Sequence, residues 1–168
     1  MMGLTLFWDG PFSQWELAPF TLDGVEYGCA EQYMMASKAR LFGDEDTLAM
    51  IMASEDPRTQ KALGRVVDGF EPEVWEEEED NGQPRCWNVV WRGSMAKFSQ
   101  NEHLLEALLA TGNTLLVEAS PEDCVWGIGL AEDDPRARDP GVWRGLNWLG
   151  EVLTDVREHL VAGQRLLG

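Results

Sequence analysis

Residues 19–42 read PFTLDGVEYGCAEQYMMASKARLF and pass from one kind of secondary structure to another within a few residues. Short apolar runs flank Asp23-Gly24, a pair favoured in a two-residue type I′ turn because both positions need a positive φ. The following stretch, Ala30 to Phe42, consists mostly of good helix formers and is followed by Gly43, a common helix stop. A hairpin followed directly by a helix indicates the α+β class.

The rest of the chain adds helices and short strands. Two short apolar runs, Thr5–Trp8 and Thr114–Glu118, are expected to be strands. Further helices are expected over residues 46–53, 57–64, 87–98 and 102–110. A final amphipathic helix shows apolar residues at steps of three and four: Leu146, Leu149, Leu153, Val156 and Leu160. We therefore predict one α+β domain over residues 1–168, mostly helical with a few short strands.

Two polar stretches interrupt this pattern. Residues 71–80 carry seven acidic side chains and no basic one, and residues 132–141 are rich in Asp, Arg and Pro. Both are expected to be solvated loops.

The composition limits the classes of protein that this chain can belong to. Its 168 residues are 44% hydrophobic, enough for one core, and no apolar run reaches the roughly 18 residues of a membrane-spanning helix. A net charge of −17 repels nucleic-acid phosphates and anionic membranes. Three cysteines without a CxxC pair, two histidines and no secretory pattern predict a reduced cytoplasmic protein with no metal and no cofactor.

Glu31 and Lys38 are the first candidates for chemistry. They are seven residues apart on the expected helix, so they share one face with Met35 and Phe42. An acid and a base on an apolar stripe fit a structural ion pair, or a lysine that snorkels past its own stem. They fit equally well an acid–base site in a partly apolar cleft, where burial raises the pKa of a carboxyl group.

The loop after Glu118 is the second candidate. It carries Asp123, Trp126, Gly127 and Gly129 just beyond an expected strand, where sites are often built. The glycines allow a ligand to approach the backbone closely. The alternatives are an Asx-turn for Asp123 and a core position for Trp126.

Phosphate binding has its own candidates. Asn147 opens the final helix, where free N–H groups favour an anion, although a capping role fits it as well. Arg40, Arg65 and Lys97 are among the few cations, and a solubilising surface role is the commoner one for each. The chain has no GxSxG, P-loop, complete GxGxxG or HExxH motif, which leaves carboxylate chemistry aided by aromatic stacking.

Six segments, taken together and in this order, characterise the chain. They are PFSQW at 11–15, CAEQY at 29–33 with Lys38, LGR at 63–65, AKFSQN at 96–101, VE at 117–118 with Asp123 and WGIG at 126–129, and GLNWLG at 145–150. This ordered set resembles the NADAR family of YbiA-like proteins and spans nearly the whole chain. The resemblance implies an N-glycosidase that cuts the C–N bond between a ribose phosphate and a base-like group. It implies small-molecule substrates, either aminopyrimidine intermediates of riboflavin biosynthesis or ADP-ribosyl-guanine adducts.

The resemblance also implies roles for particular residues. It makes Glu31 and Asp123 catalytic and places Lys38 at the same site. Substrate binding is expected from two aromatic side chains and a set of small and polar residues: Trp75, Trp126, Gly127, Gly129, Glu118, Asn147 and Arg65.

The chain departs from the family pattern in three places. Gln32 stands where His is usual, and Gln14 stands where Asn is usual. The stretch after Trp75 is longer and more acidic than usual, so Trp87 is the alternative stacking residue. The departures at Gln32 and Gln14 favour a second hypothesis, a non-catalytic module that binds ADP-ribose or another nucleotide. The charge of residues 71–80 favours a third, an acidic surface that binds a basic partner.

The chemistry expected of the first hypothesis fits these residue types. Cleavage of an N-glycoside passes through an oxocarbenium-like state at ribose C1′, which a carboxylate can stabilise while it activates water. A second acidic group can protonate the leaving base. A lysine amine could instead trap C1′ as a Schiff base.

Overall fold

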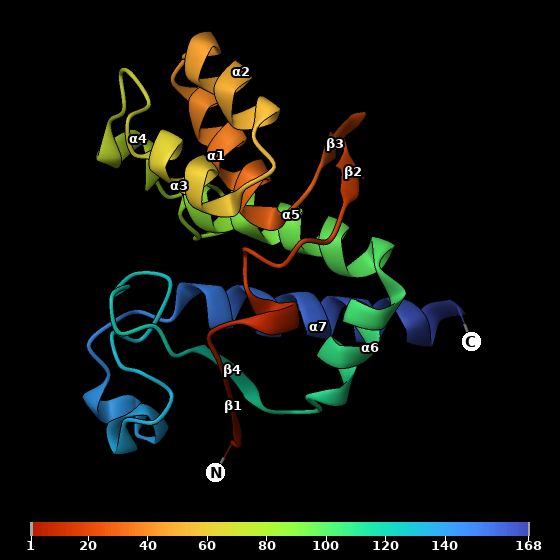
Figure 1. Cartoon of the computed structure of the whole chain (residues 1–168). Helices are drawn as coiled ribbons and strands as arrows, with labels where there is room; N and C mark the ends of the chain where they lie inside the picture. The colour runs from red at the N-terminus through yellow and green to blue at the C-terminus, as the bar shows by residue number, and fades with distance from the viewer. Residues whose placement is uncertain (1, 168) are drawn as a thin grey trace. The chain divides into compact units, whose positions relative to one another are not determined.

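The computed structural model describes residues 2–167, which fall into two compact units (Figure 1). Unit 1 takes the described residues of Met1–Ser13 and Glu102–Gly168, and unit 2 is Gln14–Asn101. Seven α-helices and two small sheets among the described residues confirm the α+β class. No helix in this part of the chain combines the length and the apolar character needed to cross a membrane. The single domain over 1–168 stays a prediction.

Unit 2 begins with the hairpin, which forms as predicted. Strands β2 (Phe20–Leu22) and β3 (Val25–Tyr27) pair antiparallel. Asp23 has a φ of 52° and Gly24 a φ of 78°, the two positive values that a type I′ turn needs.

Helix α1 (Ala30–Leu41) is the centre of unit 2. Nine of its twelve residues are buried, and it packs against three other helices. The helices of unit 2 that follow it are α2 (Glu45–Ala53), α3 (Pro57–Gly64), α4 (Pro72–Trp75) and α5 (Arg85–Gln100). Two glycines bring α1 close to its neighbours: a Cβ on Gly64 would overlap the Met35 side chain, and one on Gly93 would lie 2.6 Å from Tyr33.

The acidic stretch 71–80 is only partly the solvated loop that its charge predicts. Its first half forms α4, with Pro72 in the first turn, and the Trp75 side chain is only 6% exposed. The apolar Trp75 explains the difference, because burying an aromatic side chain stabilises a turn that exposed acids alone would not.

The acidic side chains of this stretch are partly paired. Arg85 bonds Glu77 at 2.6 Å and Glu79 at 3.3 Å. The stretch and α5 line an open groove of about 660 Å³ that contains none of the predicted site residues.

Unit 1 is built on a parallel strand pair that joins distant parts of the chain. Strand β1 (Leu4–Phe7) pairs with β4 (Leu115–Glu118), with Leu4 opposite Leu115. Helix α7 (Trp148–Leu167) packs on β4. The remaining elements of unit 1 are η1 (Gly10–Phe12), α6 (Glu102–Ala110), η2 (Pro135–Arg138) and η3 (Pro140–Val142).

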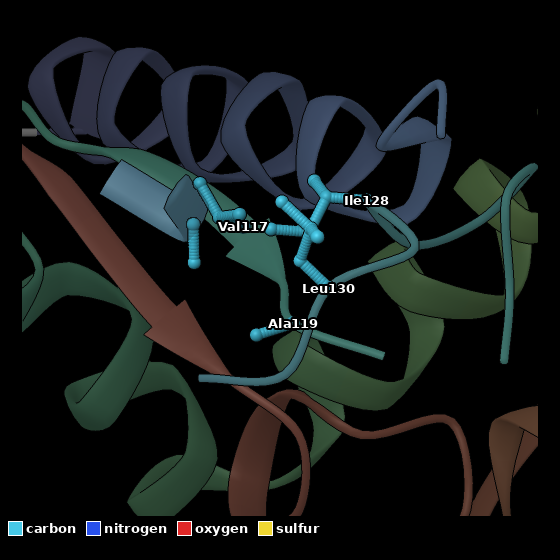
Figure 2. Close-up of a cluster of buried hydrophobic side chains, with 5 residues drawn as sticks. Val117, Ala119, Ile128 and Leu130 are labelled. Carbon is cyan, nitrogen blue, oxygen red and sulfur yellow. The ribbon is translucent and has the colours of Figure 1, made fainter. Parts of the chain in front are cut away.

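A small apolar cluster joins β4 to the segments that come after it in the chain (Figure 2). It consists of Val117, Ala119, Ile128, Leu130 and Ala137, each at most 2% exposed. The cluster fixes the course of the loop that connects β4 to residues 128–130.

The stretch 132–141 also departs from the solvated loop predicted for it. It forms two short 3₁₀ helices, and Ala137 is fully buried. Asp134 and Asp139 cap these helices, and the Trp143 indole donates to the Ala137 carbonyl at 2.8 Å. Asx capping lets so polar a segment order itself with few apolar contacts.

Helix α7 confirms most of the predicted apolar stripe. Leu149, Leu153 and Val156 are buried, while Leu146 precedes the helix and is 54% exposed.

Candidate functional site

Glu31 lies in the first turn of α1. Cys29 is the N-cap residue, and the Glu31 N–H donates to the Gln14 carbonyl at 3.0 Å, which ties the start of the helix to residue 14. The Glu31 side chain is only 6% exposed. A carboxylate near a helix N-terminus is favoured by the helix dipole, which offsets part of the cost of its burial.

Lys38 lies two turns further along the same face and is also buried. Its ammonium donates to the Gly64 carbonyl at 2.7 Å and lies 3.8 Å from the centroid of the Phe70 ring. Burial lowers the pKa of Lys38, and the nearby Glu31 charge opposes that shift. The two side chains thus interact electrostatically, but the ammonium bonds a neutral carbonyl rather than the carboxylate. The simple structural ion pair does not form.

The side-chain amide of Gln32 forms hydrogen bonds with backbone groups of the protein. Its amide donates to the Ile51 carbonyl at 3.1 Å and the Ser54 carbonyl at 3.2 Å, and its oxygen accepts the Gly28 N–H at 2.8 Å. These bonds fasten the start of α1 to the end of α2. The departure from His at this position therefore has a structural explanation.

Lys97, a candidate for phosphate binding for which a solubilising surface role is the commoner expectation, is instead a buried cation. It lies on α5 and is only 1% exposed. Burial lowers its pKa to about 8, and the charges of Glu16 and Cys29 oppose the shift. The signal that could have revealed it is its spacing from Val90 and Ser94, since the three lie on one helical face of which the other two are buried.

Both candidate stacking tryptophans are buried in unit 2. Trp75 ends α4 and is 6% exposed, while Trp87 lies in the first turn of α5 and is 7% exposed. The Trp87 indole N–H and the Ser94 hydroxyl are buried without a hydrogen-bond partner among residues 2–167. Since a buried Trp N–H normally has a partner, Trp87 remains a full alternative to Trp75.

Asp123 in unit 1 organises its own loop. Its Oδ1 accepts the N–H groups of Val125 at 2.9 Å and Trp126 at 2.8 Å. These bonds form the Asx-turn that was the alternative to a catalytic role for Asp123. The structure gives no partner to Oδ2 among the described residues, so one carboxylate oxygen is left for chemistry.

Trp126 is half-buried beside a second indole. Its ring meets that of Trp148 edge to face, with centroids 5.7 Å apart and planes at 78°. The indole is therefore neither a fully buried core residue nor a freely exposed one.

The glycines and Asn147 near this loop have clear roles in the packing of unit 1. A Cβ on Gly127 would lie 3.0 Å from the Asp123 and Glu118 carbonyl oxygens, and Gly129 has a φ of 69°. Asn147 also has a positive φ, 57°; its side chain accepts the Glu118 N–H and donates to the Leu116 carbonyl, each at 3.0 Å. Contact of these residues with a substrate stays a prediction.

Arg40 and Arg65 are both exposed, but they differ in whether the guanidinium already has a hydrogen-bond partner among the described residues. Arg40 donates to the Tyr27 hydroxyl at 2.7 Å, whereas Arg65 is the exposed C-cap residue of α3. A phosphate-binding role for Arg65 stays a prediction.

The predicted site residues thus fall into two groups. Unit 2 brings Glu31 and Lys38 together on one buried face, and unit 1 brings Asp123, Trp126 and Asn147 together around one loop. A shared pocket for the two groups stays a prediction from the sequence.

Comparison with known proteins identifies the family. The profile of the NADAR domain matches residues 6–161. N-glycosidase R617 of Acanthamoeba polyphaga mimivirus is 43% identical over 153 residues, which cover 88% of this chain and 86% of that protein. N-glycosidase YbiA of Escherichia coli strain K12 is 31% identical over 151 residues, 90% of this chain and 81% of that protein.

A solved structure and a plant protein extend the comparison. The NMR structure of E. coli YbiA matches with a TM-score of 0.76 and 28% identity, over 98% of this chain and 89% of that chain. The chloroplastic riboflavin biosynthesis protein PYRR of Zea mays is 30% identical over 120 residues, 69% of this chain but only 16% of that protein. With a family profile that spans both units and relatives that are N-glycosidases, the chain belongs to the NADAR family and is an N-glycosyl hydrolase.

Proposed function

We propose that the protein hydrolyses the C–N bond between C1′ of a ribose phosphate and a base-like group. The substrate classes are aminopyrimidine intermediates of riboflavin biosynthesis and ADP-ribosyl-guanine adducts. The first class is supported by the likeness to a plant protein named for riboflavin biosynthesis. Its products would be ribose 5-phosphate and the free aminopyrimidine, in the cytoplasm.

The observation that carries this proposal is the buried pair on α1. Glu31 and Lys38 share one face, both are at most 9% exposed, and Lys38 bonds a backbone carbonyl instead of neutralising Glu31. Burying two ionisable groups on one helical face costs folding free energy, and such a cost is typical of residues kept for chemistry.

The proposed reaction balances with water as the only co-reactant. The C1′–N bond breaks and its electron pair goes to the base nitrogen, leaving positive charge at C1′. Water adds to C1′ and gives one proton to the Glu31 carboxylate. The protonated Glu31 gives this proton to the base nitrogen, directly or through solvent, so the carboxylate is restored and the products are the free base and the ribose with a C1′ hydroxyl. Proton transfer of this kind contributes about 10²–10⁴ in rate.

The other site residues take supporting roles. The free Oδ2 of Asp123 supplies negative charge for the oxocarbenium-like state, and Trp126 lines the sugar. The indole of Trp75, or of Trp87 in its place, stacks on the base. We assign Lys38 an electrostatic role toward substrate oxygen atoms, because its ammonium is held by a carbonyl and by an aromatic face, both of which favour the charged form.

The non-catalytic binding module loses part of its support. It relied on the departure at Gln32, and the Gln32 amide is fully used in bonds to backbone groups of unit 2. Binding of a basic partner through residues 71–80 loses support as well, because Arg85 already pairs with two of the acids.

The test is a turnover assay of the purified protein with each substrate class. Mass spectrometry would follow release of ribose 5-phosphate from an aminopyrimidine ribosyl phosphate, and of ADP-ribose from ADP-ribosylated guanosine. In ¹⁸O-water the label is expected in the sugar product and not in the base. Tight binding of both compounds with no turnover would refute the hydrolase and support the binding module.

A further inference from the structure

The face of the Phe70 ring covers the Lys38 ammonium, which also donates a hydrogen bond to a backbone carbonyl. The Nζ atom lies 3.8 Å from the centroid of the ring and 2.7 Å from the Gly64 oxygen. Phe70 itself is 36% exposed, so its other parts reach solvent while one face touches the buried cation. The ring face is therefore part of what surrounds the buried ammonium.

The ring is held in place by its own segment. The Asp68 N–H donates to Asp44 Oδ2 at 2.8 Å, which ties this segment to the N-cap of α2. Gly69 follows with a φ of 71°, a turn conformation that suits glycine. The Phe42 ring then meets Phe70 nearly edge-on, with centroids 5.3 Å apart and planes at 79°.

We propose that Phe70 is a positioning residue for Lys38: the face of its ring keeps the ammonium charged and fixed, so that the site uses Lys38 as a stationary cation. This inference rests on the proposed function, in which Lys38 serves the glycosidase site. The ring is attracted to a cation because the face of an aromatic ring carries partial negative charge. A neutral amine gains little from the same contact.

Few charged groups act on Lys38, so the effect of the Phe70 ring on the Lys38 pKa can be measured separately from theirs. Among the described residues, Glu31 on the same helix is the charged group that acts on the Lys38 pKa. Helix α3 contributes the neutral Gly64 carbonyl, and the segment before α4 contributes the Phe70 ring. Burial lowers the Lys38 pKa and the Glu31 charge opposes that shift. The carbonyl and the ring face both favour the charged form, so in the proposed arrangement they oppose it as well. Loss of the ring face should therefore lower the pKa further.

A purely structural ring would behave differently. If Phe70 only covered apolar surface, Phe70→Leu would lower stability and leave the titration of Lys38 unchanged. The decisive readout is therefore the Lys38 pKa and the pH profile that follows from it, not activity at one pH.

The chain suits a direct measurement because it has only three lysines, Lys38, Lys61 and Lys97. Protein labelled with ¹³C and ¹⁵N in lysine gives three side-chain NMR signals, assigned with Lys38→Met. The pKa of Lys38 would be measured in the wild type, Phe70→Leu, Phe70→Tyr and Phe42→Leu. The tyrosine variant keeps an aromatic face, and Phe42→Leu removes a ring of the same pair that does not cover the ammonium.

We expect Phe70→Leu to lower the Lys38 pKa by about half a unit, the size of an exposed cation–aromatic contact. Phe70→Tyr should keep the wild-type value, and Phe42→Leu should cause less than half of the shift. The upper-pH limit of ribose 5-phosphate binding, followed by the same NMR signals, should fall in parallel. An unchanged Lys38 pKa in folded Phe70→Leu would overturn the proposal.

Two further results separate this inference from the proposed function. If the Lys38 pKa falls but ribose 5-phosphate binding keeps its pH profile, the positioning role is wrong even though the contact is real. If the wild type turns over none of the glycosides, the hydrolase proposal fails on its own, while the titration and the binding profile still decide the role of Phe70.

Discussion

Met35 on α1 lies directly against Gly64 at the end of α3, so closely that a Cβ on Gly64 would overlap the Met35 sulfur. The carbonyl of the same Gly64 accepts the hydrogen bond of the Lys38 ammonium. One small residue therefore sets both the spacing of two helices and the position of a site cation.

Gly64→Ala should destabilise the protein by about 1–3 kcal/mol, because the added methyl group forces Met35 to move in a packed core. Chemical denaturation measures the change. Gly163→Ala in α7 is the matched control: nothing lies within 4 Å of its Cβ position, so it should stabilise by about 0.5–1 kcal/mol through helix propensity. A Gly64→Ala protein as stable as the wild type would show that α1 and α3 can separate at little cost.

Glu31→Gln should leave the fold intact and lower kcat by about 10²–10⁴, because it removes the group that accepts the proton of water. Steady-state kinetics together with a circular dichroism melt check both parts. Glu26→Gln on the exposed edge of β3 removes the same charge from the surface and should leave kcat unchanged. Wild-type turnover by folded Glu31→Gln would exclude Glu31 as the essential carboxylate.

Lys38→Arg should retain part of the activity, because a guanidinium keeps the charge but cannot form a Schiff base. Lys38→Met should lose most of it. Borohydride added during turnover, followed by mass spectrometry, should find no sugar attached to Lys38. A reduced adduct at Lys38, with an inactive Lys38→Arg, would establish covalent catalysis instead.

Lys97→Met should stabilise the protein near pH 7 by roughly 1–3 kcal/mol. The pKa of Lys97 falls from 10.5 to about 8 on folding, so below pH 8 the folded state carries a buried charge that the unfolded state hydrates freely. Between about pH 8 and 10.5 the unfolded state binds more protons, and the stability of the wild type rises relative to the variant. Denaturation of both proteins across this range should show the advantage of Lys97→Met shrinking. An advantage for the wild type near pH 7 would mean that the interactions of Lys97 in the folded state outweigh the cost of burying its charge.

Asn147→Ala should cost about 2–4 kcal/mol, since it leaves the Glu118 N–H and the Leu116 carbonyl without their partners and places alanine at a positive φ. Asn147→Gly separates the two effects, because glycine accepts the φ of 57° but makes neither bond. Urea denaturation of the two variants beside the exposed Asn113→Ala is the measurement. Equal stability of Asn147→Gly and the wild type would show that the side-chain bonds contribute nothing.

The parts of the fold that follow from neighbouring residues were predictable. Asp23-Gly24 specified the hairpin, and Asp56-Pro57 specified the start of α3, where the Asp56 side chain accepts the Thr59 N–H at 3.1 Å. The pairing of β1 with β4 was not predictable in the same way, because the paired residues are more than a hundred positions apart. The sequence of one strand also contains nothing that identifies the other strand as its partner.

The candidate site divides in a similar manner. Glu31 and Lys38 could be placed on one face because a helix fixes the relation between residues seven apart. Lys97 was assigned to the surface because lysine is almost never fully buried, and only its packed neighbours show otherwise. The contact of Phe70 with Lys38 depends on how the segment before α4 folds back, which no local pattern encodes.

The β1–β4 pair has a consequence for synthesis on the ribosome. Leu4 leaves the ribosome long before its partner Leu115 is made, at about 5–20 residues per second. During that delay residues 14–101, which form unit 2 without interruption, can fold from contacts that are already available. The apolar first strand meanwhile waits as an unpaired edge, the kind of segment that associates with other chains and that chaperones recognise. Slowing translation after residue 101 should therefore increase aggregation more than slowing it before residue 14.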